Sequence, residues 1–428
     1  MKINIFWFRR DLRLEDNTAL KHALADGTPV LPLFIFDTSI IEELPPDDPR
    51  VSFIYDRLSE INSELKKHNS SLLVFKGDPL STWKKLTDIY DIGKVYFNKD
   101  YEPYAVARDR EISSHLYGKG ISVFSFKDQV IFEENEILTA EQKPYTIFTP
   151  YRKRWMQKLM QAGHFRLPVN KTFTPNYYNH NIQFPSRNEL GFMESSIRVK
   201  QYDTDVIKDY DKFRDFPTLD RTSYLGPHLR FGTVSIRLIT EKALVENQTF
   251  LDELIWREFF IQVIYHFPGV VTGNFRSKYD NVAWRNDEKE FERWCSGNTG
   301  YPLVDAGMRQ LNETGYMHNR VRMITAGFLC KHLLTDWRWG EAYFALKLLD
   351  YELSSNNGNW QWAAGTGCDA AQYFRVFNPF TQQKRFDPKM DYIRKWIPEF
   401  GTSRYPEPMI DHDFARNRVI EAFRSGLV

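Results

Sequence analysis

The chain has 428 residues, 42% of them hydrophobic and 26% charged, with a formal net charge of +1 at pH 7. This composition is that of a globular protein and excludes the disordered class, and with this length it suggests two or three domains. Three cysteines exclude a disulfide framework and the apolar runs are far too short to span a bilayer, so we expect a cytoplasmic protein without membrane contact.

Short apolar runs alternate with segments of helical spacing along residues 1–131. Strands are predicted at 3–8, 30–36, 71–75, 95–98 and 121–126. Helices are predicted at 17–25, 51–67, 80–90 and 104–116. This alternation predicts an α/β domain with a doubly wound parallel sheet. Residues 7–17 (WFRRDLRLEDN) contain no glycine, so the sheet is not expected to hold a dinucleotide in the Rossmann manner.

The alternation of strand and helix ends after residue 131. Residues 132–200 are rich in Pro, Asn, Thr and Tyr and are predicted to form a connector, with one basic helical segment at 151–160 (YRKRWMQKLM). From 201 to 428 the apolar spacing is helical, most clearly at 251–267, 301–314, 319–334 and 341–349. We therefore predict an all-helical second domain.

Aromatic residues make up 15% of the chain, and eight of its 11 tryptophans lie between Trp256 and Trp396. Such rings most often fill a large core, but a stacking surface or a redox path is the functional alternative. The densest cluster is the segment 356–379 (NNGNWQWAAGTGCDAAQYFRVFNP). Instead of forming a functional site, this segment could be a glycine-rich loop that leads into a core helix.

Further segments combine polar and apolar residues on one helix face. Glu253 and Trp256 are three residues apart, so a carboxylate and an indole could hold a flat polar ligand, although a surface Glu and a core Trp explain them too. In 318–323 (HNRVRM), Asn319 and Met323 share a face, whereas Arg322 could simply pair with Asp350.

Residues 222–226 (TSYLG) carry hydroxyl and backbone N–H groups at the expected start of a helix, which suits a phosphate or an ordinary N-cap. No segment has the spacing of metal ligands, and no nucleophile has an evident base partner, so no metal is expected. Any chemistry must then come from a bound cofactor.

These segments together, with 7–17, resemble the photolyase/cryptochrome family, and within it are most similar to class I cyclobutane pyrimidine dimer (CPD) DNA photolyases. The resemblance extends in order from about residue 3 to about residue 400. It implies an α/β antenna domain, followed by a helical domain that binds FAD. The implied cofactor contacts are Tyr210, Thr222, Ser223, Tyr224, Leu225, Gly226, Arg322, Asp350, Glu352 and Asn356, with Asn356 facing flavin N5.

The resemblance also implies a partner, damaged DNA with a flipped pyrimidine dimer, and a monomeric enzyme. The implied lining of the dimer cavity is Glu253, Trp256, Asn319, Met323 and Trp362. The implied electron path from surface to flavin is Trp284, Trp337 and Trp360. The implied DNA-contacting residues are Arg214, Arg320 and Arg375.

The implied mechanism is light-driven repair, in which excited reduced flavin gives one electron to the dimer, the cyclobutane ring opens and the electron returns. Glu253 would hydrogen-bond the pyrimidine carbonyls where negative charge develops. Two alternatives stay open. The (6-4) photolyases carry cavity histidines where this chain has Asn319 and Met323, and cryptochrome-type photoreceptors usually replace Asn356 with Asp or Cys.

Three positions depart from the family pattern. Phe250 and Asn359 stand where many members have Trp and Gly. In members with a folate antenna an Asn-Glu pair follows a Tyr-Glu dipeptide, but here Tyr101-Glu102 is followed by Pro-Tyr-Ala. This difference argues against methenyltetrahydrofolate and leaves a deazaflavin, a flavin or no second antenna chromophore as alternatives.

Overall fold

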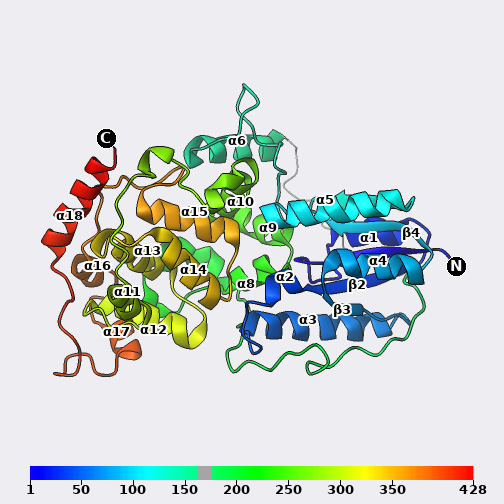
Figure 1. Cartoon of the computed structure of the whole chain (residues 1–428), viewed down its shortest axis with the longest axis horizontal. Helices are drawn as coiled ribbons and strands as arrows, with labels where there is room; N and C mark the ends of the chain where they lie inside the picture. Colours follow the sequence, from blue (N-terminus) through cyan, green and yellow to red (C-terminus); the bar gives the residue numbers. More distant parts are fainter. Residues whose placement is uncertain (162–175, 428) are drawn as a thin grey trace. The chain divides into compact units, whose positions relative to one another are not determined.

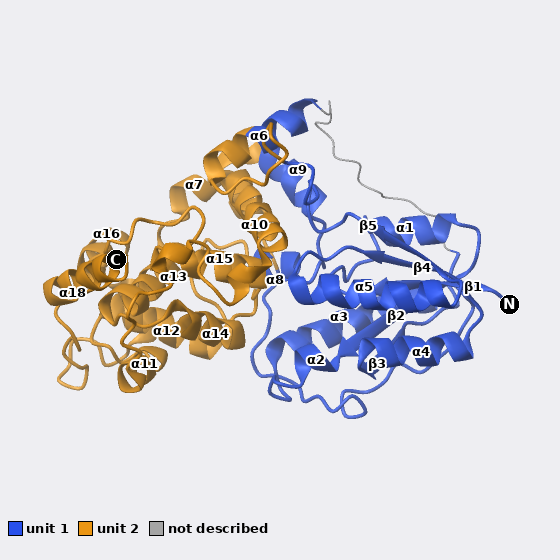
Figure 2. Cartoon of the chain, turned by 45° about the horizontal axis from the view of Figure 1, so that its top comes forward, with its two compact units in different colours: residues 1–137, 154–201, 225–245 blue, residues 138–153, 202–224, 246–428 orange. Residues whose placement is uncertain are grey.

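The computed structural model describes residues 1–161 and 176–427 and divides the chain into two compact units (Figure 2). Unit 1 comprises 1–137, 154–201 and 225–245, and unit 2 comprises 138–153, 202–224 and 246–428. The boundaries 1–131, 132–200 and 201–428 that we drew from the sequence remain a prediction. Residues 162–175 of the predicted connector lie outside the described residues.

Unit 1 contains a five-stranded parallel sheet with the order β3-β2-β1-β4-β5. Its strands are β1 (Ile3–Phe8), β2 (Val30–Asp37), β3 (Leu73–Gly77), β4 (Ile92–Asn98) and β5 (Ser122–Phe126). The helices of unit 1 are α1 (Thr18–Ala25), α2 (Thr38–Ile41), α3 (Pro49–Lys66), α4 (Pro79–Ile89), α5 (Pro103–Gly118), α8 (Leu225–Arg230) and α9 (Ile236–Glu246). This arrangement confirms the predicted doubly wound sheet.

Alternate residues of β1 enter two different cores, which explains why the strand is apolar throughout. Phe6 and Phe8 pack with α1 and α3 on one face of the sheet. Ile5 and Trp7 pack with Trp83 of α4 and with α5 on the other face. Figure 1 shows these helices along the sheet. Both faces of the sheet are therefore covered within unit 1.

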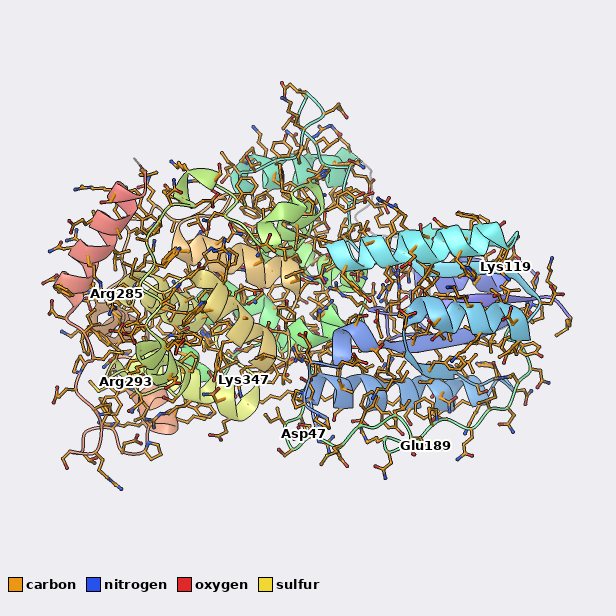
Figure 3. The ribbon with its side chains drawn as sticks, in the orientation of Figure 1. Asp47, Lys119, Glu189, Arg285, Arg293 and Lys347 are labelled. Carbon is orange, nitrogen blue, oxygen red and sulfur yellow. The ribbon has the colours of Figure 1, made fainter. Side chains whose placement is uncertain are left out.

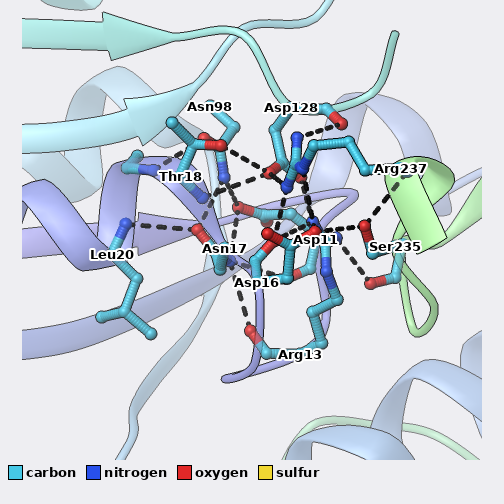
Figure 4. A network of polar contacts seen from close by, with 12 residues as sticks. Asp11, Arg13, Asp16, Asn17, Thr18, Leu20, Asn98, Asp128, Ser235 and Arg237 are labelled. Carbon is cyan, nitrogen blue, oxygen red and sulfur yellow. Dashed lines mark hydrogen bonds and ion pairs between the residues drawn. The ribbon is translucent and has the colours of Figure 1, made fainter. Parts of the chain in front are cut away.

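The glycine-free segment after β1 forms a buried network of charges (Figure 4). Arg13 pairs with Asp128 at 2.6 Å, and Arg237 of α9 reaches Asp16 and Asp128, each at 2.8 Å. Burial by itself raises the pKa of Asp128. The guanidinium groups of Arg13 and Arg237 lower this pKa by more than burial raises it, so the pKa lies below its usual value. Removing one partner from such a buried pair costs about 3–5 kcal/mol. The arginines and aspartates of this segment thus connect the strand ends to α9.

Unit 2 is built from helices, as predicted. They are α7 (Tyr210–Phe213), α10 (Gln248–His266), α11 (Glu288–Cys295), α12 (Pro302–Thr314), α13 (Asn319–Gly327), α14 (Trp337–Lys347), α15 (Leu353–Ala364), α16 (Pro379–Phe386), α17 (Asp391–Trp396) and α18 (His412–Ser425). Helix α6 (Phe148–Gln161) starts in unit 2 and continues into unit 1. A π-helix, Phe328–His332, directly follows α13.

Helices α10 and α15 approach each other closely at a glycine. A Cβ atom on Gly358 would overlap the ring of Phe260, so only glycine allows this approach. Segment 356–364 is helical, as part of α15, although its glycine content had left a loop open as an alternative. Helix α15 ends at Gly365, which has a φ of +87°.

Charged side chains of both signs cover the exterior, in agreement with the net charge of +1. Figure 3 labels examples, among them Lys119 and Glu189 in unit 1 and Arg285 and Lys347 in unit 2. Among the described residues, the structure contains no helix that combines the length and the apolar character needed to cross a membrane.

Candidate functional site

Two adjoining cavities lie within unit 2. The first, between α13, α14 and α15, is lined among others by Arg322, Phe344, Asp350, Asn356 and Trp360. The second is lined by Arg214, Glu253, Trp256, Arg257, Phe260, Asn319, Met323, Ser355, Asn359 and Trp362. Five residues line both cavities: Asn319, Met323, Ser355, Asn359 and Trp362. The structure thus gathers residues from distant segments around one continuous site.

Helix α13 presents Asn319 and Met323 to both cavities, four residues apart and hence on one face. His318 caps the helix, because its Nδ1 accepts a hydrogen bond from the backbone N–H of Arg320 at 3.2 Å. Burial, reinforced by the nearby Arg322, lowers the pKa of His318 to about 4. The capping nitrogen therefore remains an acceptor at neutral pH.

Trp256 and Trp362 form the aromatic walls of the second cavity. The Trp256 ring is stacked on Phe148, with ring centroids 3.7 Å apart and planes within 7°. Phe259 and Phe260 also contact Trp256, at centroid distances of 5.6 and 5.4 Å. These three rings fix the orientation of the indole, so Trp256 packs against an aromatic cluster while it lines the cavity.

Polar groups of the first cavity are held in pairs. Arg322 forms an ion pair with Asp350 at 3.0 Å, and both residues line the cavity. Asn356 donates a hydrogen bond from Nδ2 to Oε1 of Glu341 at 2.8 Å. Phe344, Leu348, Trp360 and Ala363 form apolar walls of the same cavity. This combination suits a flat ring system with one apolar edge and one polar edge.

Glu352 and Arg257 connect the helices that carry the site. Arg257 of α10 donates to Oε1 of Glu352, at the start of α15, at 2.7 Å. Ser355 donates to the other carboxylate oxygen at 3.0 Å. Glu352 and Ser355 line the first cavity, while Arg257 and Ser355 line the second. This buried ion pair therefore holds α10 and α15 together where the cavities meet.

Glu253 forms an ion pair with Arg214 at 2.6 Å on the wall of the second cavity. Burial raises the pKa of the Glu253 carboxyl above its usual value, and the Arg214 guanidinium opposes that shift. Glu253 is thus a partly buried, paired carboxyl rather than a plain surface residue.

The other two arginines predicted to contact DNA differ in their surroundings. Arg320 pairs with Asp215 at 2.6 Å and lies over the ring of Phe386 at 4.5 Å. Arg375 is exposed, with its guanidinium 5.9 Å from the centre of the Phe377 ring. Of the three predicted DNA contacts, Arg214 lines the second cavity, whereas Arg320 and Arg375 are in neither of the two linings.

The three tryptophans of the predicted electron path border one core of unit 2. Trp360 lines the first cavity and contacts Phe344 and Trp294, at centroid distances of 4.9 and 6.1 Å. Trp337 is buried and donates from Nε1 to Asn274 at 2.9 Å. Trp284 is partly buried against Phe423. Trp360 is the member of the path that reaches a cavity.

Residue 210 and residues 222–226, which were predicted to contact the cofactor, line neither of the two cavities. Tyr210 lies under the Arg214 guanidinium at 5.0 Å and contacts Phe250 at 5.1 Å. Tyr224 has a φ of +54°, and its ring lies 5.1 Å from that of Tyr316. Thr222 and Ser223 precede it in unit 2. Leu225 and Gly226 open the short helix α8 and belong to unit 1.

Several lining residues were missed at the sequence level. Arg257 follows Trp256 directly and lies one turn after Glu253, so helical spacing could have identified it. Glu341 lines neither cavity but contacts the lining residue Asn356, and the sequence carries no signal for it because that contact depends on how α14 and α15 pack. Asn359 was noted only as a departure from a family pattern, yet it lines both cavities.

Comparison with known proteins gives consistent results over the chain. Residues 4–171 match the family model of DNA photolyase, and residues 250–402 match that of the FAD binding domain of DNA photolyase. A deoxyribodipyrimidine photo-lyase of Halobacterium salinarum is 35% identical, with 98% of each chain covered.

Solved structures agree with this result. A class III photolyase from Agrobacterium tumefaciens has a TM-score of 0.88 and 32% identity, with 100% of this chain and 98% of that chain covered. A cryptochrome of Synechocystis has a TM-score of 0.85 and 26% identity, with 99% of each chain covered.

Proposed function

Because this chain belongs to the DNA photolyase family, we propose that it is a light-dependent DNA-repair lyase that splits cyclobutane pyrimidine dimers with bound FAD. The observation that carries the proposal is the pair of adjoining cavities with five shared lining residues. An electron donor in one cavity and a base in the other would be separated only by these side chains.

The first cavity has the chemistry needed for the ring system of FAD. Its apolar walls match the benzenoid edge, and the Arg322–Asp350 pair and the Asn356 amide offer donors and acceptors to the polar edge. Apart from Arg214, the linings of both cavities lie within residues 250–402, which match the FAD-binding family model. When bound, FAD supplies the absorption of light and the electron that the dimer receives.

The second cavity offers what a flipped dimer requires. Trp256 and Trp362 provide apolar faces for stacking, and such contacts are worth about 1–3 kcal/mol per base. Glu253 and Asn319 provide polar groups for the base edges. A dimer costs less to extrude from the helix than an intact base pair does, which favours the lesion over undamaged DNA.

We infer that Arg320 and Arg375 contribute to binding the phosphates around the lesion. With a net charge of only +1, the chain should bind undamaged duplex weakly, and its affinity should fall as salt rises. The protein would act as a monomer in the cytoplasm and would be associated with the nucleoid when it is bound to DNA. Sedimentation of the protein with and without a lesion oligonucleotide tests the monomeric state.

The decisive experiment illuminates the flavin-loaded protein with DNA that contains either a thymine CPD or a (6-4) product. We expect light-dependent repair of the CPD alone, and no repair in the dark. Repair of the (6-4) product alone would overturn the choice of lesion. Among the described residues that line the two cavities there is no histidine, which disfavours (6-4) chemistry.

A photoreceptor without repair activity is the second candidate function. The similarity to a cryptochrome at a TM-score of 0.85 favours it. Asn356 argues for repair, because the photoreceptors of the family usually carry Asp or Cys there. A protein that binds flavin, responds to blue light and repairs neither lesion would be a photoreceptor.

A further inference from the structure

The indole of Trp337 is buried at the start of α14, and its polar group is hydrogen-bonded. Trp337 is 1% exposed and packs in the same core of unit 2 as Trp360. Its Nε1–H donates to Oδ1 of Asn274 at 2.9 Å, although the two residues are 63 positions apart. An indole N–H can only donate, so Asn274 must present its carbonyl oxygen to the ring.

The other end of the Asn274 amide is held by a carboxylate. Asn274 donates from Nδ2 to Oδ1 of Asp280 at 2.8 Å. The two hydrogen bonds form a chain from the carboxylate through the amide to the indole, and such chains polarise their members. The charge of Asp280 therefore makes the Asn274 oxygen a stronger acceptor, although water around the exposed Asp280 weakens this influence.

A cation lies over the face of the same indole. The guanidinium carbon of Arg338 is 4.9 Å from the centre of the Trp337 ring. Arg338 is held there by a hydrogen bond to the carbonyl of Thr272 at 2.9 Å and by an ion pair with Asp336 at 2.8 Å. The Asp336 carboxylate compensates part of the charge. The attraction between a cation and an indole depends on the electron density of the ring, so Arg338 opposes removal of an electron from Trp337.

Asn274 and Arg338 thus act in opposite directions on an oxidised ring. Loss of one electron puts positive charge on the indole and makes its N–H strongly acidic. A hydrogen bond from a charged donor is stronger than one from a neutral donor, so Asn274 favours the oxidised form of Trp337. The amide oxygen is too weak a base to take the proton, which therefore stays on Nε1.

We propose that Asn274 and Arg338 are positioning residues of Trp337, which make this tryptophan a relay of the electron path rather than its end. Trp337 gives one electron to oxidised Trp360, which has itself given one electron to photoexcited oxidised flavin. Trp337 becomes a cation radical, keeps its proton in the hydrogen bond to Asn274 and regains one electron from Trp284. A thiolate in solution returns an electron to Trp284, and two of the resulting thiyl radicals combine to a disulfide.

The proposal rests on the proposed function, since it takes the bound flavin and the electron path from Trp284 to Trp360 as given. The test records the absorbance of tryptophan radicals after a light flash on protein that is loaded with oxidised flavin, in the presence of a thiol. A second measurement needs no flash: the NMR resonance of the Trp337 Nε1–H in protein with isotope-labelled tryptophan, assigned with Trp337→Phe. This resonance reports the hydrogen bond to Asn274 directly.

The variants are Asn274→Leu, Asn274→Asp, Asp280→Asn and Arg338→Gln. Asp280→Asn alters an exposed side chain and leaves the core intact, so it tests the proposal even if Asn274→Leu does not fold. Asn281→Leu and Arg394→Gln are the matched controls, because both residues are exposed and line neither cavity.

We expect Asn274→Leu to move the indole N–H resonance upfield and to lower the yield of oxidised Trp337 by about fivefold, the difference between hydrogen bonds with a charged and a neutral partner. Asp280→Asn should change the yield in the same direction but less.

The other two variants change the fate of the radical. In Asn274→Asp the carboxylate should take the proton, so that a neutral Trp337 radical replaces the cation radical and decays more slowly. Arg338→Gln should lengthen the lifetime of the cation radical by about two- to fivefold, because the opposing cation is gone. The control variants should keep the kinetics of the unaltered protein.

Three results overturn the proposal while the proposed function stands. The first is a radical yield in Asn274→Leu and Asp280→Asn that equals the yield in Asn281→Leu. The second is an indole N–H resonance that does not move in Asn274→Leu. The third is a cation radical that decays faster in Arg338→Gln than in the unaltered protein. If Trp337→Phe photoreduced its flavin as fast as the unaltered protein, the electron path would fail, and if the protein bound no flavin, the proposed function would fail first.

Discussion

The Asn356 amide is oriented by Glu341, which accepts the Nδ2 hydrogen bond at its carboxylate at 2.8 Å and at its own backbone carbonyl at 3.1 Å. Both acceptors come from the same residue of α14, so both Nδ2 hydrogens are engaged there. The carbonyl oxygen of Asn356 is then the atom available to the ligand. An acceptor there suits an N–H donor on the ring that binds.

Replacing Glu341 with Gln should change how stability depends on pH. Burial raises the pKa of Glu341 above 4.5, so the folded protein binds this proton more tightly than the unfolded chain. Stability contributed by the protonated group is present at low pH and lost as pH rises above 4.5 toward the folded-state pKa. Relative to Glu341→Gln, the unaltered protein should therefore lose stability as pH rises. Urea unfolding between pH 4 and 8 measures this, and parallel curves for the two proteins would refute it.

Gly340→Ala should destabilise the protein by about 1–3 kcal/mol, as overpacking does. The added methyl would overlap the ring of Trp360 and lie 2.6 Å from a methyl carbon of Leu329. Gly269→Ala is the control, because no atom lies within 4 Å of its added Cβ. Thermal unfolding of the flavin-loaded variants checks this difference. If the Gly340→Ala protein is as stable as the Gly269→Ala control, then α14 can shift to accommodate the methyl group without a loss of stability.

Trp360→Phe should slow photoreduction of the bound flavin by at least about tenfold, corresponding to a barrier more than about 1.4 kcal/mol higher. Phenylalanine is much harder to oxidise than tryptophan, and Trp360 is the ring of the predicted path that lines the cavity. Repair by protein that is already reduced should persist. Trp294→Phe is the control: Trp294 contacts Trp360 but is outside the predicted path. Slower photoreduction in both variants would mean that electrons also pass through Trp294.

His332 should make the protein sensitive to acid. Its Nε2 lies 2.9 Å from Nδ1 of His412, and burial, followed by the repulsion of His412 and Arg418, lowers the pKa of His332 to about 3. The unfolded chain gains this proton near pH 6.5 and the folded protein does not, so stability is lost as pH falls from 6.5 to about 3. The slope reaches about 1.4 kcal/mol per pH unit for one proton.

His332→Gln should flatten that slope in urea unfolding between pH 4 and 7. His68→Gln is the matched control, because His68 is exposed at the end of α3. If the slope of His332→Gln equals that of the control, acid sensitivity arises elsewhere, for instance at His318.

Sequence patterns located the sheet well because both its faces are covered. Strands buried on two sides are continuously apolar, and this signal identified β1 and β2 to within one residue. It failed at the start of β4, which begins at Ile92, because Gly93 and Lys94 interrupt the apolar run. Helix α15 was ambiguous for a different reason: Gly358 is required by its contact with Phe260, which is distant in sequence.

The candidate site was predictable where helical spacing governs it. The shared face of Asn319 and Met323 follows from their separation alone, and the Arg322–Asp350 pair was anticipated. The Arg214–Glu253 and Glu341–Asn356 pairs join residues 39 and 15 positions apart on different elements. Charge type could suggest such partners, but only tertiary packing selects them.

The shared wall of the two cavities has a thermodynamic consequence. A ligand in either cavity contacts Asn319, Met323, Ser355, Asn359 or Trp362, and so alters the surface that the other ligand meets. Binding of the two is then coupled, and any factor by which the first tightens the second must equal the factor by which the second tightens the first. Damaged DNA that tightens the equilibrium binding of flavin by some factor would bind more weakly, by the same factor, to protein stripped of its flavin.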